Sequence, residues 1–514
     1  MPGGGALEVL RQKGVFELPP AELQRVVLDR YEEFLHPLLP FLDVVQFRRT
    51  ITGQDTNTKI SLFLYHAVMF IGLSCVDNGT ISRLARVSKQ AARAASYEKA
   101  KTLFEMDIER DRAAICRGSI LLTGHPYQLD PKDATYWLGV AISQAYNMKL
   151  YRVQTNHFET REYNSERILW WCVLMKECEV AMAMDHPPRI WPFSSPMLAM
   201  SDFGLNDQEQ LQIEEGKAAL AFILKAKLYS RIYQIMRNIY EEIQPWNIKG
   251  GDEMLPELRQ HMVEHLQSWT SEVPPELRYE KRSTNKTSFS DLNVAWSMTI
   301  SKVTFWAAHF IVYMDNLQHH LPQHHLPKAK RPIDDEQSRP FLRHAASKVN
   351  EILEMFLACN TAQYLPPASI IQILLTGFIH HRDLKNEDPI IRQTSRRNLE
   401  TCLRVCQVVA DSYPFIIDVA SKFQQGTGML ESVYQRGNVG ARLEDKSDHL
   451  DSESNVHTNE LSSVNAPATA EGGTSSRSAG ESLEPEENEP AQKIYEDNSR
   501  VQGDYLEWIF PMPV

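Results

Sequence analysis

The chain has 514 residues, of which 43% are hydrophobic, so it is long enough to bury a large core in one or more domains. It contains no run of about 18 uncharged apolar residues, which argues against a membrane-spanning helix. Its first residues lack a basic segment followed by an apolar one and do not predict a secretory signal. Seven cysteines, an odd number, lie mostly in apolar helical patterns, which favours reduced thiols in an intracellular protein over disulfides.

The net charge of −12 is concentrated near the C-terminus. Residues 441–514 hold sixteen of the 66 acidic residues and five of the 54 basic ones, so the remainder is nearly neutral. Binding to phosphates needs clustered lysine and arginine. We therefore do not expect this chain to bind DNA directly.

Hydrophobic periodicity predicts an all-α fold, a large multi-helix body followed by a disordered acidic tail. We expect residues 1–20 to be a flexible N-terminus and residues 21–436 to form one all-helical domain. Alternating strand patterns are absent, and no fixed repeat marks a solenoid. The predicted helices cover Ala21–Leu35, a short helix capped by Asp43, Ile60–Cys75, Val87–Met106, Arg112–Leu122, one that starts at Asp130-Pro131 and ends near Asn147, one capped by Asn164 or Ser165 that ends at Met184, Gln208–Glu242, Leu255–Ser271, Asp291–Leu317, Ser338–Ala358, Ala368–His381, Pro389–Ser412 and Ile416–Tyr434.

The C-terminal part has a different composition. Residues 437–503 are rich in Ser, Glu, Asp, Asn, Gly and Pro and cannot bury enough apolar area to offset their ordering entropy, so we predict a disordered acidic linker. Residues 504–514 then place bulky apolar side chains among acids. Two interpretations stay open: the segment docks back on the helical body, or it is an acidic-hydrophobic activation motif that a coactivator groove binds. Its apolar residues are Tyr505, Leu506, Trp508, Ile509 and Phe510.

Specific catalytic motifs are missing: we find no phosphate-binding loop, dinucleotide fingerprint, nucleophile elbow or His-Glu-x-x-His pattern. We therefore assign no catalytic or metal-binding residues and expect no enzyme. The cluster His319–His325 is interpreted as a solvated loop rather than a metal site, and Lys328–Arg331 as a basic run that an import receptor could read. Cys402 and Cys406 share a helix face and are interpreted as core residues. We attribute His380-His381 to cation–dipole complementarity at a helix end.

Five phrases in order resemble the regulatory middle domain of fungal-specific transcription factors, the domain found behind binuclear zinc-cluster modules. The strongest is an Arg-x-x-Trp-Trp phrase, matched by Arg167, Trp170 and Trp171, with Glu166 in the first turn of the same predicted helix. Both tryptophans are expected to be buried; Arg167 either stacks on Trp171 or pairs with an acid from another helix. The other phrases are Leu39-Pro40-Phe41-Leu42-Asp43 with Phe47-Arg48, Tyr97 with Ala100, Lys101 and Leu103, Gly139 with Ala141 and Ala145 after Trp137, and Lys149-Leu150-Tyr151-Arg152.

The resemblance also has departures. Where the family usually has Asp-Arg and Gly-Arg-Pro phrases, this chain has Glu177-Cys178 and Asp185-His186-Pro187. No cysteine precedes Cys75, so the six-cysteine zinc module is not found here. We expect either that such a module lies before this sequence, in which case zinc would be its metal, or that the protein acts through a DNA-binding partner. No other cofactor is expected, and a cofactor-binding site cannot be assigned.

The resemblance implies a nuclear transcription regulator of a metabolic or secondary-metabolite gene set. Its helical domain would respond to a small-molecule effector or a partner, and its acidic tail would recruit a coactivator. Trp137, Arg167, Trp170, Trp171 and Arg189 are then structure-setting positions near any effector cavity. Two alternatives stay open: a helical scaffold without DNA binding, and a helical lyase or cyclase of secondary metabolism. The nearest acidic run that such an enzyme would need is Ile333-Asp334-Asp335-Glu336, which is better interpreted as charge at a helix start.

Overall fold

The structure is a computed structural model that describes residues 4–55, 57–125, 131–152, 161–184, 186–190, 195–206, 208, 212–242, 251–278, 289–313 and 338–425. Every regular element within these ranges is a helix, which confirms the predicted all-α fold. The predictions for the acidic linker, the terminal motif, His319–His325, Lys328–Arg331 and Ile333–Glu336 lie outside the described residues. Among the residues that are described, none of the helices has the length and apolar character that crossing a membrane requires.

The first group of helices gathers around α4 (Leu62–Gly72), which contacts α2, α6 and α7. Ten consecutive α4 residues, Phe63 to Gly72, are buried, so this helix is apolar on all sides. Ser61 caps it by accepting a hydrogen bond from the Leu64 amide at 3.1 Å. The group comprises α1 (Gly4–Gln12), α2 (Ala21–Phe34), η1 (His36–Leu38), α3 (Val44–Ile51), α4, η2 (Leu73–Cys75), α5 (Asn78–Ala85), α6 (Lys89–Glu105), α7 (Arg112–Leu122) and α8 (Ala134–Asn147).

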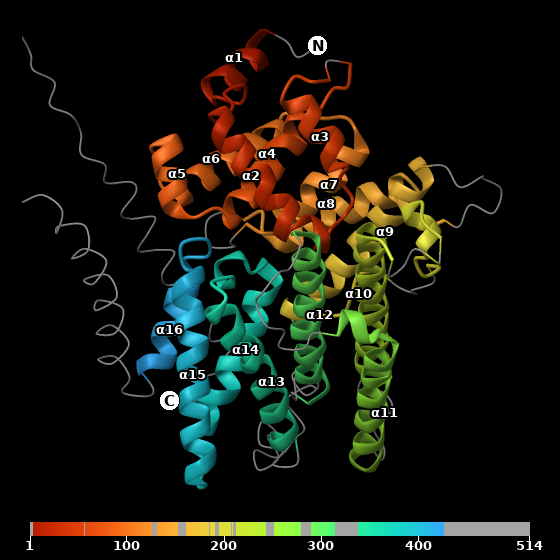
Figure 1. Cartoon of the computed structure of the whole chain (residues 1–514), viewed down its shortest axis with the longest axis vertical. Helices are drawn as coiled ribbons and strands as arrows, with labels where there is room; N and C mark the ends of the chain where they lie inside the picture. The colour runs from red at the N-terminus through yellow and green to blue at the C-terminus, as the bar shows by residue number, and fades with distance from the viewer. Residues whose placement is uncertain are drawn as a thin grey trace, which may run out of the picture. The chain divides into compact units, whose positions relative to one another are not determined.

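The second group contains long helices that run side by side (Figure 1). Along this group α10 contacts α11 and α12, α12 contacts α13, and α14 contacts both α13 and α15. The group comprises α10 (Glu214–Arg237), the π-helical turn η6 (Asn238–Glu242), α11 (Gly251–Glu272), η7 (Pro275–Leu277), α12 (Phe289–Tyr313), α13 (Arg339–Ala358), η11 (Ala362–Tyr364), α14 (Pro367–Asp383), α15 (Pro389–Val409) and α16 (Ile416–Gln425).

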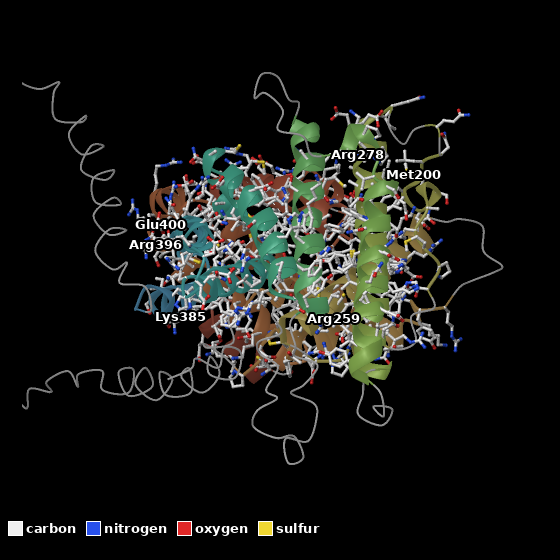
Figure 2. All side chains as sticks on the ribbon, turned by 90° about the horizontal axis from the view of Figure 1, so that it is seen from below. Met200, Arg259, Arg278, Lys385, Arg396 and Glu400 are labelled. Atoms are coloured by element: carbon white, nitrogen blue, oxygen red, sulfur yellow. The ribbon has the colours of Figure 1, made fainter. Side chains whose placement is uncertain are left out.

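Helix α9 (Arg161–Met184) connects the two groups, because it contacts α7 and α8 of the first and α10 and α14 of the second. The short 3₁₀ helix η4 (Met200–Phe203) follows it and also packs against it. Side chains fill the space between the helices (Figure 2). All three of the tryptophans Trp137, Trp171 and Trp269 are fully buried.

Several predicted boundaries were wrong. Asp133, not Asp130, caps α8, since its side chain accepts from the Tyr136 amide at 2.8 Å. Helix α9 begins at Arg161, before the predicted caps, and Asn164 instead donates to the Ser201 carbonyl at 3.0 Å. Helix α5 was missed.

The described part of the N-terminus also differs from the prediction of a loose segment, because it contains α1. The Leu10 and Val15 side chains are fully buried, and the Val15 carbonyl is hydrogen-bonded to His66 Nε2 at 2.8 Å. These contacts explain why the segment is ordered. Burial of these two apolar side chains offsets the conformational entropy that this glycine- and proline-containing segment loses when it becomes ordered.

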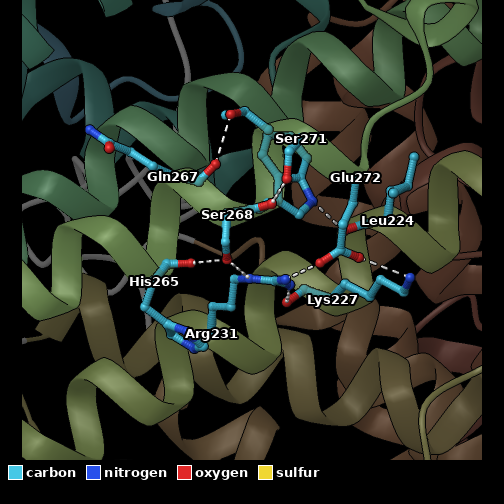
Figure 3. A network of polar contacts seen from close by, with 10 residues as sticks. Leu224, Lys227, Arg231, His265, Gln267, Ser268, Ser271 and Glu272 are labelled. Carbon is cyan, nitrogen blue, oxygen red and sulfur yellow. Dashed lines mark hydrogen bonds and ion pairs between the residues drawn. The ribbon is translucent and has the colours of Figure 1, made fainter.

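A surface network holds α11 on α10 (Figure 3). Glu272 pairs with Arg231 and, at 2.9 Å, with Lys227, while Arg231 Nε donates to Ser268 Oγ at 3.2 Å. Beneath these contacts the buried Trp269 indole donates to the Leu224 carbonyl at 2.8 Å. Exposed ion pairs contribute about 0–1 kcal/mol each, so the buried indole holds the two helices together more strongly than the charges do.

Candidate functional site

Trp137 and Gly139 lie on α8 and face different neighbours. Trp137 is fully buried, and its Nε1 donates to the Tyr97 hydroxyl at 3.1 Å. That hydroxyl in turn donates to the Lys132 carbonyl at 3.3 Å, so Trp137 ties α8 to α6. A Cβ at Gly139 would meet Arg189 Nη1 at 3.5 Å, an ordinary contact distance. Gly139 therefore lies beside Arg189, although the available space does not require a glycine there.

The Arg-x-x-Trp-Trp phrase fastens an irregular segment to the first half of α9. Arg167 Nη1 pairs with Asp202 Oδ1 at 2.9 Å, and its Nη2 donates to the Met197 carbonyl at 3.0 Å. The Trp171 indole donates to the Pro196 carbonyl at 3.1 Å, and the Trp170 indole to the Ser195 hydroxyl. We call Arg167, Trp170 and Trp171, together with residues 195–202, the double-tryptophan clamp. Glu166, half-buried on the same helix, precedes them.

The clamp settles the two roles expected for Arg167 in favour of an ion pair. Its acid is Asp202 of η4, which is only 3% exposed and also accepts from the Ala199 amide at 2.8 Å. Both tryptophans are buried as well. A buried carboxylate is stable only when it is paired and hydrogen-bonded, and Asp202 has both kinds of partner.

Arg189 and Glu177 form a second fastening. Glu177 is fully buried, and the Arg189 guanidinium grips it with Nη2 at 2.7 Å and Nε at 3.1 Å from Oε2. Arg189 Nη1 also donates to the Thr135 carbonyl at 3.0 Å, which connects α9, residues 186–190 and α8. Glu177, one of the residues that differ from the family phrase, is therefore the acid that pairs with Arg189. The pair holds residues 186–190 against α8 and α9.

A cavity of about 40 Å³ lies beside the second half of α9. It lies between the C-terminal end of α7, the helices α2, α9, α10 and α12, and the residues that begin α14. Its walls are largely apolar, and its polar side chains include Lys176 and Glu179 from α9 and Lys225 and Tyr229 from α10. The other lining residues are Tyr31, Leu35, Leu38, Leu39, Ile71, Ile120, Leu121, Thr123, Gly124, Ile300, Thr304, Pro366, Pro367, Ala368 and Ser369.

The polar side chains of the cavity form a charged cluster. Glu179 Oε2 lies 2.6 Å from Lys176 Nζ, and its Oε1 accepts from the Tyr229 hydroxyl at 2.7 Å. Lys225 Nζ lies 4.0 Å from Glu179 Oε1 and donates to the Leu38 carbonyl at 3.0 Å. The lysine on α10 therefore reaches η1, far away in the sequence, and the cluster connects the two groups of helices.

Burial and charge compete in this cluster. Burial alone would raise the pKa of Glu179, but the ammonium groups of Lys176 and Lys225 outweigh it and hold the pKa of Glu179 below its ordinary value. Burial lowers the pKa of Lys225, and the Glu179 carboxylate opposes that shift. With both lysines protonated, two cations face one carboxylate, so the cluster carries one net positive charge.

Tyr31 of α2 completes the cavity wall. Its side chain is fully buried, and its hydroxyl has no hydrogen-bond partner in the described structure. Burial raises the pKa of this phenol far above its usual range, so the hydroxyl keeps its proton and stays a potential donor. The cavity lining thus includes a residue whose hydroxyl still has a hydrogen bond to donate.

The residues predicted from the family phrases do not line this cavity. Trp137, Gly139, Glu166, Arg167, Trp170 and Trp171 all lie elsewhere. Sequence reasoning missed Tyr31, Lys176, Glu179 and Lys225. One available signal was Lys225 itself, a single charge within the apolar run Ala219–Ala226 of α10. Another was the i, i+3 spacing of Lys176 and Glu179 within a buried helix face.

The remaining residues that the sequence singled out are the cysteine pair of α15 and the histidine pair of α14. Cys402 and Cys406 are buried, and burial raises the pKa of Cys406 to about 12. All seven cysteines lie in described residues, and each is a free thiol. Burial lowers the pKa of His380 to about 4 and also lowers that of His381. The cation–dipole interpretation of these two histidines was therefore wrong, because both rings favour the neutral form. The described residues contain no group of three metal-binding side chains.

Comparison with known proteins finds one matching family model and several similar proteins. Residues 28–271 match the family model of the fungal specific transcription factor domain. The chain is 27% identical over 446 residues to cutinase transcription factor 1 beta of Fusarium vanettenii, covering 79% of this chain and 49% of that protein. It is 29% identical over 253 residues to transcription factor cpaR of Aspergillus oryzae, covering 46% of this chain and 42% of that protein.

A third relative is the fusaric acid cluster transcription factor FUB12 of Gibberella fujikuroi, 23% identical over 234 residues, with 44% of this chain and 33% of that protein covered. The chain thus spans about half or less of the length of these relatives. The matched residues begin within α2 and end within α11, so they include the double-tryptophan clamp and the charged cluster. Residues 28–271 of the chain are therefore similar to the fungal specific transcription factor domain.

Proposed function

We propose that the protein regulates transcription of a metabolic or secondary-metabolite gene set. The match of residues 28–271 to the fungal specific transcription factor domain carries this proposal. The names of the relatives add support, since one concerns cutinase and another the fusaric acid cluster. The protein works in the nucleus, and its DNA contact comes from a partner or from a zinc-cluster module, with zinc as the metal of that module.

The helical body acts as the responsive part of this regulator. Helix α9 connects two groups of helices, and the charged cluster beside its second half reaches η1 through Lys225. A small-molecule effector or a partner that favours one packing of these groups shifts the population of the body between two states. The energy for that shift is the difference between its affinities for the two states.

The acidic tail provides the output. The segment 504–514 combines acids with five bulky apolar residues, a composition suited to the groove of a transcriptional coactivator. Direct DNA binding has no role in this scheme, because the chain as a whole is acidic with a net charge of −12.

Tethering tests the proposal. Residues 1–514 fused to a heterologous DNA-binding module are expected to change output from a reporter that carries its sites. Deleting residues 504–514 is expected to remove activation, whereas deleting 461–471, an equally long tail segment without aromatic residues, leaves it intact. Unchanged output from the full fusion would contradict the regulatory role and favour a scaffold. Equal output from the two deletions would contradict the role of the terminal segment.

A further inference from the structure

We propose that the cavity lined by Tyr31, Lys176 and Lys225 binds a short-chain monocarboxylate such as propionate. The carboxylate would lie between the two ammonium groups and the Tyr31 hydroxyl, and the short carbon chain against the apolar wall. The regulatory meaning of this site rests on the function proposed above, in which such a molecule is the effector. Binding itself depends only on the residues of the cavity.

Charge is the first argument. The cluster contains two lysines and one glutamate, each with a nearly buried side chain, so with both lysines protonated it carries one uncompensated positive charge. A buried charge is costly unless it is paired. A lysine ammonium can donate three hydrogen bonds. Lys225 Nζ donates one to the Leu38 carbonyl and lies 4.0 Å from Glu179 Oε1. A single negative charge in the cavity would balance the cluster.

Hydrogen bonding is the second argument, and it is independent of the first. Tyr31 lines the cavity, and its buried hydroxyl has no partner among the described residues. Buried polar groups in native structures nearly always have a partner, so an exception at a cavity indicates a missing ligand or water. A carboxylate accepts hydrogen bonds from a phenol and from ammonium groups through separate oxygens.

Size and wall chemistry select the class of anion. A cavity of about 40 Å³ has room for roughly three waters, at about 10–15 Å³ each, and hence for a molecule with few heavy atoms. The wall between the polar groups is apolar, with Leu35, Ile120 and Ile300 among its residues. Phosphate would bring more charge than the cluster balances and would bury its oxygens against this wall. A long-chain fatty acid would not fit.

Equilibrium dialysis of the purified 514-residue chain against radiolabelled propionate, at constant pH and ionic strength, tests the inference. We expect saturable binding of one propionate per chain. Tyr31→Phe should weaken binding about tenfold, because a hydrogen bond to a charged group is lost. Lys176→Gln should weaken it by at least as much. Neither substitution changes the size of the side chain greatly, and a thermal melt verifies that each variant folds.

Tyr65→Phe is the matched control. Tyr65 of α4 is 3% exposed and its hydroxyl also lacks a partner among the described residues, but it does not line the cavity. Its loss is expected to leave propionate binding unchanged. Equal weakening by Tyr31→Phe and Tyr65→Phe would overturn the inference. Absence of saturable binding, or equal competition by chloride, inorganic phosphate and octanoate, would also overturn it.

The two proposals can fail separately. Dialysis measures binding without any DNA or coactivator, so its failure leaves the regulatory role to the reporter experiment. If propionate binds as expected while the tethered chain does not change reporter output, the binding site stands and the regulatory function is contradicted.

Discussion

Two sets of polar side chains on α9 are used in opposite ways. In the first half, Arg167, Trp170 and Trp171 direct their donors to acceptors in residues 195–202, and the buried Asp202 receives both a guanidinium and an amide. In the second half, Lys176 and Glu179 belong to a cluster with an excess positive charge beside a cavity and beside the Tyr31 hydroxyl. The same helix thus carries a set of fully paired polar side chains at the double-tryptophan clamp and a set with excess charge beside the cavity.

This difference separates support from response. A closed set of buried hydrogen bonds makes one packing far better than any other, which suits a fixed support. An open set leaves charge and a donor for an additional molecule, and a molecule that binds there adds stability only to the packing that it fits. The four predictions below test this difference between fully paired and incompletely paired polar groups, starting with the largest expected effect.

Trp171→Ala should have the largest effect on stability. The side chain is fully buried, so its loss leaves a cavity and removes the hydrogen bond that its indole donates to the Pro196 carbonyl. We expect the free energy of unfolding to fall by about 4 kcal/mol, within the range for large aromatic-to-alanine changes in a core. Urea unfolding followed by circular dichroism measures it. Trp171→Phe, which keeps most of the volume, should lose well under half as much; equal losses would contradict a packing role.

Glu179→Gln should lower the free energy of unfolding by about 3 kcal/mol, because it leaves Lys176 and Lys225 buried without their carboxylate. Glu272→Gln is the matched control. Glu272 also pairs with two cations, Lys227 and Arg231, but its side chain is one third exposed, so its loss should cost less than about 1 kcal/mol. Similar losses at the two sites would show that burial does not govern the cluster.

The pH dependence of stability should also involve Glu179. Its folded pKa lies below the ordinary value of 4.5, so the unfolded chain binds this proton more readily. The stabilisation is therefore fully present above pH 4.5 and is lost as the pH falls through the folded pKa. Urea midpoints between pH 6 and pH 3 should fall less steeply below pH 4.5 in Glu179→Gln than in the wild type. Parallel curves would refute the assigned pairing.

Tyrosine-to-phenylalanine changes should have the smallest effects on the free energy of unfolding. The effect should depend on whether the lost hydroxyl had hydrogen-bond partners. Tyr31→Phe removes an unpartnered hydroxyl, so stability should stay within about 0.5 kcal/mol or rise, since no hydrogen bond is lost. Tyr97→Phe removes a hydroxyl that accepts from Trp137 and donates to Lys132, and should cost about 1–2 kcal/mol. Thermal melts of both variants measure the contrast. A larger loss for Tyr31→Phe would show that its hydroxyl has a partner.

Local patterns predicted much of the helical body. Arg112–Leu122 was predicted with both ends in place, and Asp43 caps α3 as expected, because a cap and its amide are only three residues apart. Errors arose where distant residues decide. Helix α1 is stabilised by burial of Leu10 and Val15. Asn164 donates a hydrogen bond to the Ser201 carbonyl of η4 instead of capping α9. His380 lies in the last turn of α14, where a charged ring would suit the dipole, but complete burial keeps it neutral.

The amino-acid sequence by itself determined the helical class, the family phrases and the position of the acidic tail, because periodicity, motifs and composition are local properties. Only the tertiary structure decided that the family tryptophans hold residues 195–202 and that Tyr31, Lys176 and Lys225 share a cavity. Those three residues come from helices far apart in the chain. Their common environment follows from packing and burial, which no local stretch of sequence encodes.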